Sequence, residues 1–274
     1  MLNTAQIYWN FDPRFFPSLF ENIGLEPRWY GLLFAAGFLV GFQIIKKILK
    51  IENRPEQWAD SLLIYVMVGT VLGARLGHVF FYDWAYYSQN LNEILMIWKG
   101  GLASHGAAAG NIIALYIWSK KVSKQHVLWT LDRVVITIAL AGAFIRLGNF
   151  LNSEIIGSPT NVPWAVVFMQ VDSIPRHPSQ IYEAVAYLGI FTILYLSYFK
   201  FGKGNQRGFI FGAFLSLVFG FRFLIEFLKA EQKDFEVEMV LNMGQWLSIP
   251  LVLAGLYFLW AGSRNPTEVK GSDQ

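Results

Sequence analysis

Long apolar stretches separated by polar loops dominate the chain. A helix needs roughly 20 mostly apolar residues to cross the hydrocarbon core of a membrane. Seven stretches approach or exceed this length, at about Trp29 to Ile45, Trp58 to Phe81, Gly100 to Trp118, Val127 to Phe150, Pro178 to Phe199, Gly208 to Leu228 and Gln245 to Trp260. The pattern predicts an all-α, polytopic integral membrane protein with about seven transmembrane helices. We expect residues 1–274 to form a single integral-membrane domain, with a polar tail at about 263–274.

The composition supports a membrane protein. Of the 274 residues, 54% are hydrophobic and 15% are charged, whereas a typical soluble domain has about 25% charged residues. The net charge of +3 therefore fits Lys and Arg in membrane-facing loops better than nucleic-acid binding. The chain contains no Cys, so it has no disulfide, no thiolate metal site and no thiol nucleophile of its own.

Lys and Arg are distributed unequally between alternate loops. The loops that follow the first, third, fifth and seventh stretches carry twelve of them, and the other loops carry six, Lys229 among them. Cytoplasmic loops of membrane proteins are enriched in Lys and Arg. The asymmetry therefore predicts that the N-terminus lies outside and the C-terminus lies in the cytoplasm.

Several polar and ionisable residues lie in or beside the apolar stretches, where a charge costs at least about 2.5–3.5 kcal/mol and indicates a functional site by default. They are Arg75 and His78 in the second stretch, Arg146 and Asn149 in the fourth with Glu154 beyond it, His177, Gln180 and Glu183 around the start of the fifth, and Arg222 and Glu226 in the sixth. On the predicted topology most of them map to the outer half of the membrane, which argues against independent structural roles. A simpler interpretation remains for Arg222 and Glu226, because oppositely charged residues four apart on a helix neutralise each other. Asp132 and Arg133, near the basic side, are expected to be structural.

The third stretch surrounds His105 with Gly and Ala residues. Small residues let helices approach closely and also leave room beside His105 for a ligand. A packing seam in which His105 bonds to a neighbouring carbonyl is the alternative.

Clustered arginines indicate a phosphate or carboxylate ligand, since guanidinium groups bind such oxygens and stay protonated. In a membrane the obvious anion is a phospholipid headgroup. A His can act as a general base near neutral pH. The H-E-x-x-H and G-x-S-x-G motifs and a P-loop are absent from the sequence, so no metal site or nucleotide chemistry is predicted.

One segment closely resembles the signature of a known family. Residues 146–157, Arg-Leu-Gly-Asn-Phe-Leu-Asn-Ser-Glu-Ile-Ile-Gly, resemble the G-R-x-G-N-F-x-N-x-E-x-x-G signature of the bacterial prolipoprotein diacylglyceryl transferases. Further matching segments occur in order at residues 28–31, 73–82, 100–106, 177–183, 222–227 and 244–246, so the resemblance covers about residues 24–262. The chain departs from the family at Ile145 and Ala107, where Gly is usual, and both departures concern helix packing.

The resemblance implies transfer of the diacylglyceryl group of phosphatidylglycerol to the thiol of a lipobox Cys, with release of glycerol phosphate and with no metal or organic cofactor. The implied catalytic residues are Arg146 and Arg222, which would hold the phosphate, and His105 and Glu154, between which the sequence does not decide the general base. The expected phosphatidylglycerol-binding residues are Tyr30, Arg75, Asn149, Gly157, Arg146 and Arg222. The expected supporting residues are His177, Gln180, Tyr182, Glu183 and Glu226.

The implied partners are phosphatidylglycerol, a prolipoprotein lipobox peptide and membrane lipids, with no nucleic acid. The implied location is the bacterial inner membrane, with the active site toward the outer leaflet. A phospholipid or small-anion transporter that uses the same arginines is the alternative function. Such a transporter should place charges in both halves of the membrane, and the inner half is nearly bare here.

Overall fold

The computed structural model describes residues 7–20, 26–230 and 240–264. Most of the expected polar tail, the first six residues and part of the expected outer loop at 229–244 lie outside the described residues. Contacts divide the chain into two compact units, one of residues 1–41 and 132–274 and the other of residues 42–131. We describe each unit by itself, and a single membrane domain stays a prediction.

The prediction of an all-α membrane protein is confirmed. The described residues contain six helices that are long and apolar enough to cross a membrane. They are α2 (Trp29–Ile51), α3 (Gln57–Phe81), α6 (Val127–Leu151), α7 (Ser179–Phe199), α8 (Phe209–Ile225) with its 3-10 extension (Glu226–Leu228), and α9 (Met243–Arg264). The expected stretches coincide with these helices to within a few residues at most ends. The orientation of the termini stays a prediction.

The third expected stretch forms a shorter helix than predicted. Helix α5 runs over Ser104–Trp118, which gives about 22 Å at 1.5 Å per residue, and it continues into a π-helical turn at Ser119–Ser123. The predicted start at Gly100 is wrong, because Gly100 and Gly101 have φ angles of +81° and +70°, outside the right-handed helical region. A seventh span therefore stays a prediction.

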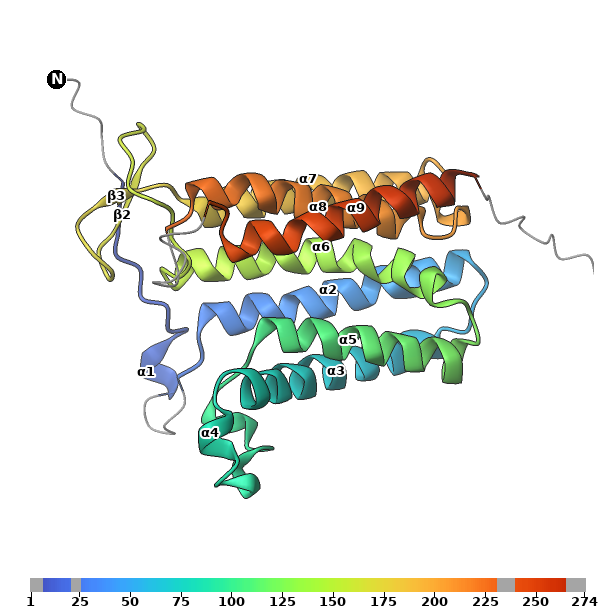
Figure 1. The fold of residues 1–274 in the computed structure, drawn as a ribbon, viewed down its shortest axis with the longest axis horizontal. Coiled ribbons are helices and arrows are strands. Elements are labelled where there is room, and N and C mark those ends of the chain that lie inside the picture. The colour runs from blue at the N-terminus through green and yellow to red at the C-terminus, as the bar shows by residue number, and fades with distance from the viewer. Residues whose placement is uncertain (1–6, 21–25, 231–239, 265–274) are drawn as a thin grey trace, which may run out of the picture. The chain divides into compact units, whose positions relative to one another are not determined.

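In the unit of residues 42–131, α3 and α5 lie side by side (Figure 1). Glycines spaced four apart on both helices form the contact: a Cβ atom at Gly77 would lie 2.6 Å from the Cα of Gly106, and one at Gly73 would lie 2.9 Å from the Cα of Gly110. This small-residue spacing lets the two backbones touch. The connection between the helices holds α4 (Trp84–Tyr87) and two 3-10 turns, Leu91–Glu93 and Ile97–Lys99.

In the other unit, α8 and α9 also lie side by side (Figure 1). A Cβ atom at Gly212 would lie 2.6 Å from the backbone nitrogen of Leu259. Asp132, at the boundary of this unit in α6, is buried and accepts hydrogen bonds from the backbone N–H groups of Gly208 (2.7 Å) and Phe211 (2.9 Å) at the start of α8. Asp132 therefore caps α8, in keeping with its expected structural role.

A small sheet accompanies these helices. Strand β1 (Ile7–Trp9) runs parallel to β2 (Val166–Phe168), with Ile7 opposite Val166, and β2 pairs antiparallel with β3 (Pro175–Arg176). The short helix α1 (Pro17–Phe20) follows β1 in the chain. Strands β2 and β3 belong to the connection between α6 and α7, which carries the end of the signature segment.

Candidate active site

Five charged side chains from α6, α7, α8 and the segment after α8 form a continuous series of ion pairs, which we call the ion-pair chain. The Nε of Arg146 lies 3.3 Å from Oε2 of Glu183, and the Nζ of Lys229 lies 3.1 Å from Oε1 of Glu183. The same Nζ lies 3.1 Å from Oε1 of Glu226, which also lies 3.6 Å from the Nε of Arg222. Positive and negative groups therefore alternate from Arg146 to Arg222.

The ion-pair chain is buried in its centre and more open at its ends. The side chain of Glu183 is 0% exposed and that of Lys229 is 3% exposed, whereas those of Arg146 and Arg222 are 13% and 33% exposed. A buried charge is tolerated only when it is paired. Three cations and two carboxylates leave one positive charge in excess, at a place where the terminal arginines reach the surface.

Asn149 links Arg146 to the carboxylate of Glu154 in the signature segment. Nη1 of Arg146 lies 3.5 Å from Oδ1 of Asn149, and the Nδ2 of Asn149 donates to Oε2 of Glu154 at 3.1 Å. The Nδ2 of Asn152 donates to the other carboxylate oxygen of Glu154, also at 3.1 Å. Asn149 is buried and Glu154 is exposed, so an amide side chain holds this carboxylate beside the arginine.

The start of α7 holds the backbone around Glu154. The Nε2 of Gln180 donates to the carbonyl of Glu154 at 2.7 Å, and the Oγ of Ser179 donates to the carbonyl of Ile155 at 3.1 Å. Ser153 and Ile155 both have left-handed φ angles, +55° and +52°, which is unfavourable for a β-branched residue such as Ile. Such strain persists where surrounding contacts determine the backbone, and it is frequent at functional sites.

Tyr30 packs against the same turn of α6. A Cβ atom at Gly148 would lie 2.7 Å from Cδ2 of Tyr30, so only Gly at this position lets the ring lie on the helix. Tyr30 therefore packs on α6 at Gly148, next to Asn149 in the chain, and its role in a shared site stays a prediction.

Gly157 and His177 lie where three backbone segments meet. The backbone N–H of Gly157 donates to the carbonyl of His177 at 3.1 Å, and a Cβ atom at Gly157 would lie 2.9 Å from the carbonyl oxygen of Leu228. These contacts give Gly157 a packing role, and the substrate contact expected of it stays a prediction. The Nδ1 of His177 lies 3.3 Å from the hydroxyl of Tyr182, which accepts a hydrogen bond from Nε1 of Trp164 at 2.6 Å.

Two functional candidates were not identified from the sequence. Lys229 is expected from the sequence among the outer-loop charges, yet it bridges Glu183, which is buried, and Glu226, whose side chain is 9% exposed; its spacing of three from Glu226 was the available signal. Asn242 donates to Oε2 of Glu226 at 3.2 Å. A Cβ atom at Gly244 would lie 2.7 Å from Oε1 of Glu226, so Gly at this position leaves room for the carboxylate.

The two remaining expected residues, His105 and Arg75, belong to the unit of residues 42–131. His105 is the second residue of α5 and is exposed. Arg75 is fully buried in α3, and its guanidinium donates to the backbone carbonyls of Glu93 (2.7 Å), Ile94 (2.7 Å) and Gly100 (2.6 Å). Backbone carbonyls thus accept hydrogen bonds from the Nε, Nη1 and Nη2 of Arg75, which is the geometry of a structural residue, and the expected phosphate contact stays a prediction.

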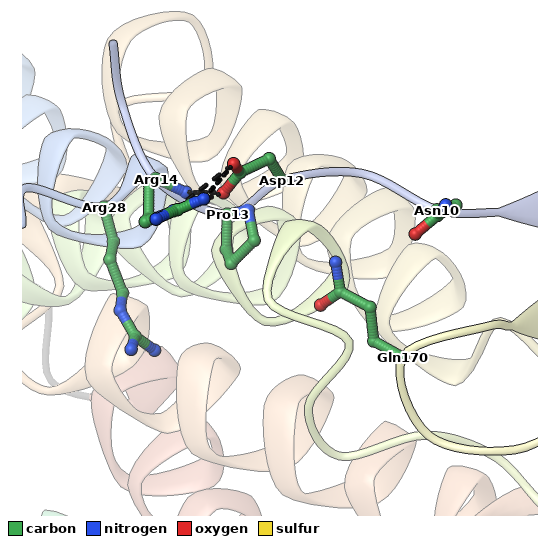
Figure 2. A pocket seen from close by; sticks show the side chains of 6 residues that line it. All are labelled: Asn10, Asp12, Pro13, Arg14, Arg28 and Gln170. Carbon is green, nitrogen blue, oxygen red and sulfur yellow. Dashed lines mark hydrogen bonds and ion pairs between the residues drawn. The ribbon is translucent and has the colours of Figure 1, made fainter. Parts of the chain in front are cut away.

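A depression of about 540 Å³ is lined by none of the expected site residues (Figure 2). Its lining residues are Asn10, Asp12, Pro13, Arg14, Arg28 and Gln170. Arg14 donates to both carboxylate oxygens of Asp12, and these hydrogen bonds lower the pKa of Asp12. Arg14, one of the two arginines that line the depression, is thus already paired with a carboxylate. Within the described ranges, no group of three or more His, Asp or Glu side chains is placed to hold a metal ion.

Comparisons with known proteins were made for the whole chain. The sequence profile of one family, described as prolipoprotein diacylglyceryl transferase, matches residues 17–261. A protein of Tolumonas auensis named phosphatidylglycerol-prolipoprotein diacylglyceryl transferase is 46% identical over 253 residues, which cover 92% of this chain and 96% of the relative. Proteins with the same name from Chloroherpeton thalassium and Porphyromonas gingivalis are 44% and 43% identical, and the matches cover 95% and 97% of this chain and 96% and 98% of the relatives.

Proposed function

The chain belongs to the prolipoprotein diacylglyceryl transferase family, and we propose that it transfers the diacylglyceryl group of phosphatidylglycerol to the lipobox cysteine of prolipoproteins. The observation that carries this proposal for the chain's own residues is the ion-pair chain, which ends in two partly exposed arginines with one positive charge in excess. A phosphodiester anion in a phospholipid headgroup has the charge and the oxygen acceptors that these arginines require.

The proposed reaction exchanges one bond to carbon for another. The cysteine sulfur attacks the diacylglyceryl carbon that carries the phosphate, the S–C bond forms, and the C–O bond breaks. Its electron pair leaves on the phosphate oxygen, so glycerol phosphate is released and the thiol proton passes to a base. The reaction needs no redox partner, and the residues proposed here supply binding, charge stabilisation and proton transfer.

The glutamates orient the arginines for this task. Glu183 holds the Nε of Arg146, and Glu226 holds the Nε of Arg222, so the terminal nitrogens of each guanidinium are directed toward other acceptors. In the proposed mechanism they bind the phosphate oxygens, and they stabilise the charge that grows on the phosphate as the C–O bond breaks. Tyr30 and Asn149, which lie beside Arg146, contribute the contacts to glycerol or phosphate oxygens.

Two groups remain candidates for the general base. His105 is exposed and makes no hydrogen bond to another described residue through its ring, whereas both carboxylate oxygens of Glu154 accept amide hydrogen bonds. We favour His105, since Glu154 is already engaged with Asn149 and Asn152. A pH-rate profile decides between them: a thiol of pKa about 8.5 ionises by itself at high pH, so a variant without the base should recover activity above pH about 9, and we expect this for His105→Gln and not for Glu154→Gln.

The proposed location follows from the topology. We place the protein in the bacterial inner membrane, with its C-terminus in the cytoplasm and the active site toward the outer leaflet. The unequal distribution of Lys and Arg between alternate loops supports this orientation, and the six apolar helices support a multi-pass membrane protein.

The function is tested with purified protein, phosphatidylglycerol vesicles and a lipobox Cys peptide. We expect the peptide to gain the mass of a diacylglyceryl group while glycerol phosphate is released in equal amount. A peptide with Cys→Ser should not react, and Arg146→Ala should abolish transfer while the protein still inserts. Release of glycerol phosphate without a gain in peptide mass would reject the transferase assignment, and movement of lipid without either product would favour the transporter.

A further inference from the structure

Arg75 is a fully buried arginine whose bonds go almost entirely to backbone. Its Nε donates to the carbonyl of Ile94, its Nη2 to that of Glu93, and its Nη1 to that of Gly100, at distances of 2.6–2.7 Å. The ring of Tyr87 lies 4.8 Å from the guanidinium carbon. A planar guanidinium with donors at fixed angles can bind three carbonyls at once, which the single ammonium of a lysine does not reproduce.

The carbonyls that Arg75 binds belong to the connection between α3 and α5. Gly100 and Gly101, at the end of this connection, both have positive φ angles. A Cβ atom at Gly101 would lie 2.5 Å from Cδ2 of His78 and 3.0 Å from Nη1 of Arg75. The chain therefore turns tightly over one face of α3 immediately before α5 begins.

The same face of α3 also holds the residue before α5. The backbone N–H of Ala103 donates to the carbonyl of Ala74 at 2.9 Å, and Ala74 is the neighbour of Arg75 in α3. Helix α5 begins at Ser104, and His105 follows. Two neighbouring residues of α3 thus determine where α5 begins, and this fixes the position of His105 within the unit.

We propose that Arg75 is a positioning residue, which acts on the reaction by holding the connection at Glu93, Ile94 and Gly100 and so placing His105. This inference rests on the proposed function, in which His105 is the favoured base. It differs from the expectation drawn from the sequence, because Arg75 does not bind the phospholipid. A displaced base lowers the rate of the chemical step and leaves the binding of phosphatidylglycerol unchanged.

The test compares full-length Arg75→Lys with wild type in three measurements: kcat, KM for phosphatidylglycerol, and backbone hydrogen exchange of residues 88–104. We expect kcat to fall about 100-fold, the loss that a displacement of about 1 Å can cause, with KM changed less than twofold. Exchange in residues 93–103 should rise at least tenfold. Arg54→Lys is the matched control, because Arg54 lies in the same unit and its guanidinium carbon lies over the ring of Trp129, 5.9 Å from the ring centre; it should leave all three measurements unchanged.

A second variant perturbs the same turn and leaves Arg75 unsubstituted. A Cβ atom at Gly100 would meet nothing within 4 Å, so Gly100→Ala acts only through its positive φ angle, and it should show the same fall in kcat with KM unchanged. An increase in KM for phosphatidylglycerol with kcat retained in Arg75→Lys would overturn the proposal in favour of headgroup binding. Unchanged exchange at residues 93–103 would also overturn it. Wild-type protein without any transfer activity would refute the proposed function alone, since the exchange measurement still reports on the connection.

Discussion

Lys229 offers the sharpest test of the ion-pair chain, because it is the central cation and lies 3.1 Å from a carboxylate oxygen on either side. Lys229→Met removes this charge and keeps most of the apolar volume. Glu183, which is 0% exposed, then keeps its ion pair with Arg146, and Glu226 keeps Arg222 and the hydrogen bond from Asn242. Removing one partner of a buried ion pair destabilises a protein by about 3–5 kcal/mol. Because each glutamate still has an arginine partner, we expect a loss at the lower end of this range, about 3 kcal/mol.

That loss is large enough to measure by thermal unfolding in detergent. For a chain of this size, about 3 kcal/mol lowers Tm by about 6–12 °C. Lys229→Arg should stay within about 3 °C of wild type, since a guanidinium can contact the same two carboxylates. The control is Lys200→Met, which removes an exposed lysine from the same unit and should leave Tm unchanged.

A double substitution separates charge balance from packing. Lys229→Met leaves equal numbers of positive and negative groups in the ion-pair chain, and adding Glu183→Gln restores the excess of one positive charge. Contacting residues typically couple by about 0.5–3 kcal/mol, so the double variant should be more stable than the sum of the single effects predicts. If Lys229→Met has the same Tm as wild type, or if the effects of the two substitutions on the free energy of unfolding are additive, the ion-pair chain does not stabilise the site.

Three further predictions concern the surrounding fold. Gly73→Val should destabilise the contact between α3 and α5 by about 1–3 kcal/mol through overpacking, seen as a lower Tm, whereas Gly189→Val, at a position with open space for a Cβ, should not. Asp132→Ala should lower Tm by removing a buried acceptor of two backbone N–H groups, at about 1–3 kcal/mol for a buried donor left unpaired; Asp132→Asn should lose less. The hydrogen bond from Lys99 lowers the pKa of Glu93, so this pair stabilises the connection to α5 above the ordinary carboxyl pKa and stops doing so as pH falls through the lowered value. The protection factors of residues 88–100, which compare the observed exchange with the intrinsic exchange rate at each pH, should therefore fall on acidification in wild type, and this fall should be absent in Glu93→Gln.

The sequence predicted the helices well because a membrane span has a strong and simple pattern. Six of the expected stretches coincide with long apolar helices, since hydropathy over about 20 residues is hard to mistake. The predicted start of α5 was wrong because apolar character carries no information about the φ angle. Gly100 and Gly101 have the small side chains of a membrane span, but their positive φ angles place them in the turn before the helix.

The composition of the site was only partly predictable. Arg146, Glu183, Arg222 and Glu226 were expected near one another from their depth in the membrane, and the structure joins them through ion pairs. Lys229 was not, because its spacing of three from Glu226 was the one local signal and its contact with Glu183 depends on a long-range pairing, in which Lys229 lies opposite Gly157.

Arg75 shows a different limit. Its place in an apolar stretch predicts a functional residue, and we expected its guanidinium to bind a phosphate. The actual partners are backbone carbonyls, which every residue carries and which therefore leave no trace in the sequence. An intramembrane arginine has two ways to satisfy its donors, and only the structure distinguishes them.

The contrast between Arg75 and the ion-pair chain explains how one chain can carry several arginines in a membrane with different tasks. Arg75 is fully buried and donates to neutral carbonyls of the connection between α3 and α5, so its hydrogen bonds serve the fold. Arg146 and Arg222 are paired through Nε with glutamates and remain partly exposed, so much of the cost of placing a cation among apolar helices is offset. Terminal donors that Asn149 does not occupy are left for a ligand. Lys229 between the two glutamates keeps the net charge positive. In the proposed function, the alternation of charge thus meets two requirements at once: it stabilises the arginines in an apolar surrounding, and it leaves them able to bind the phosphate of a lipid from the same membrane.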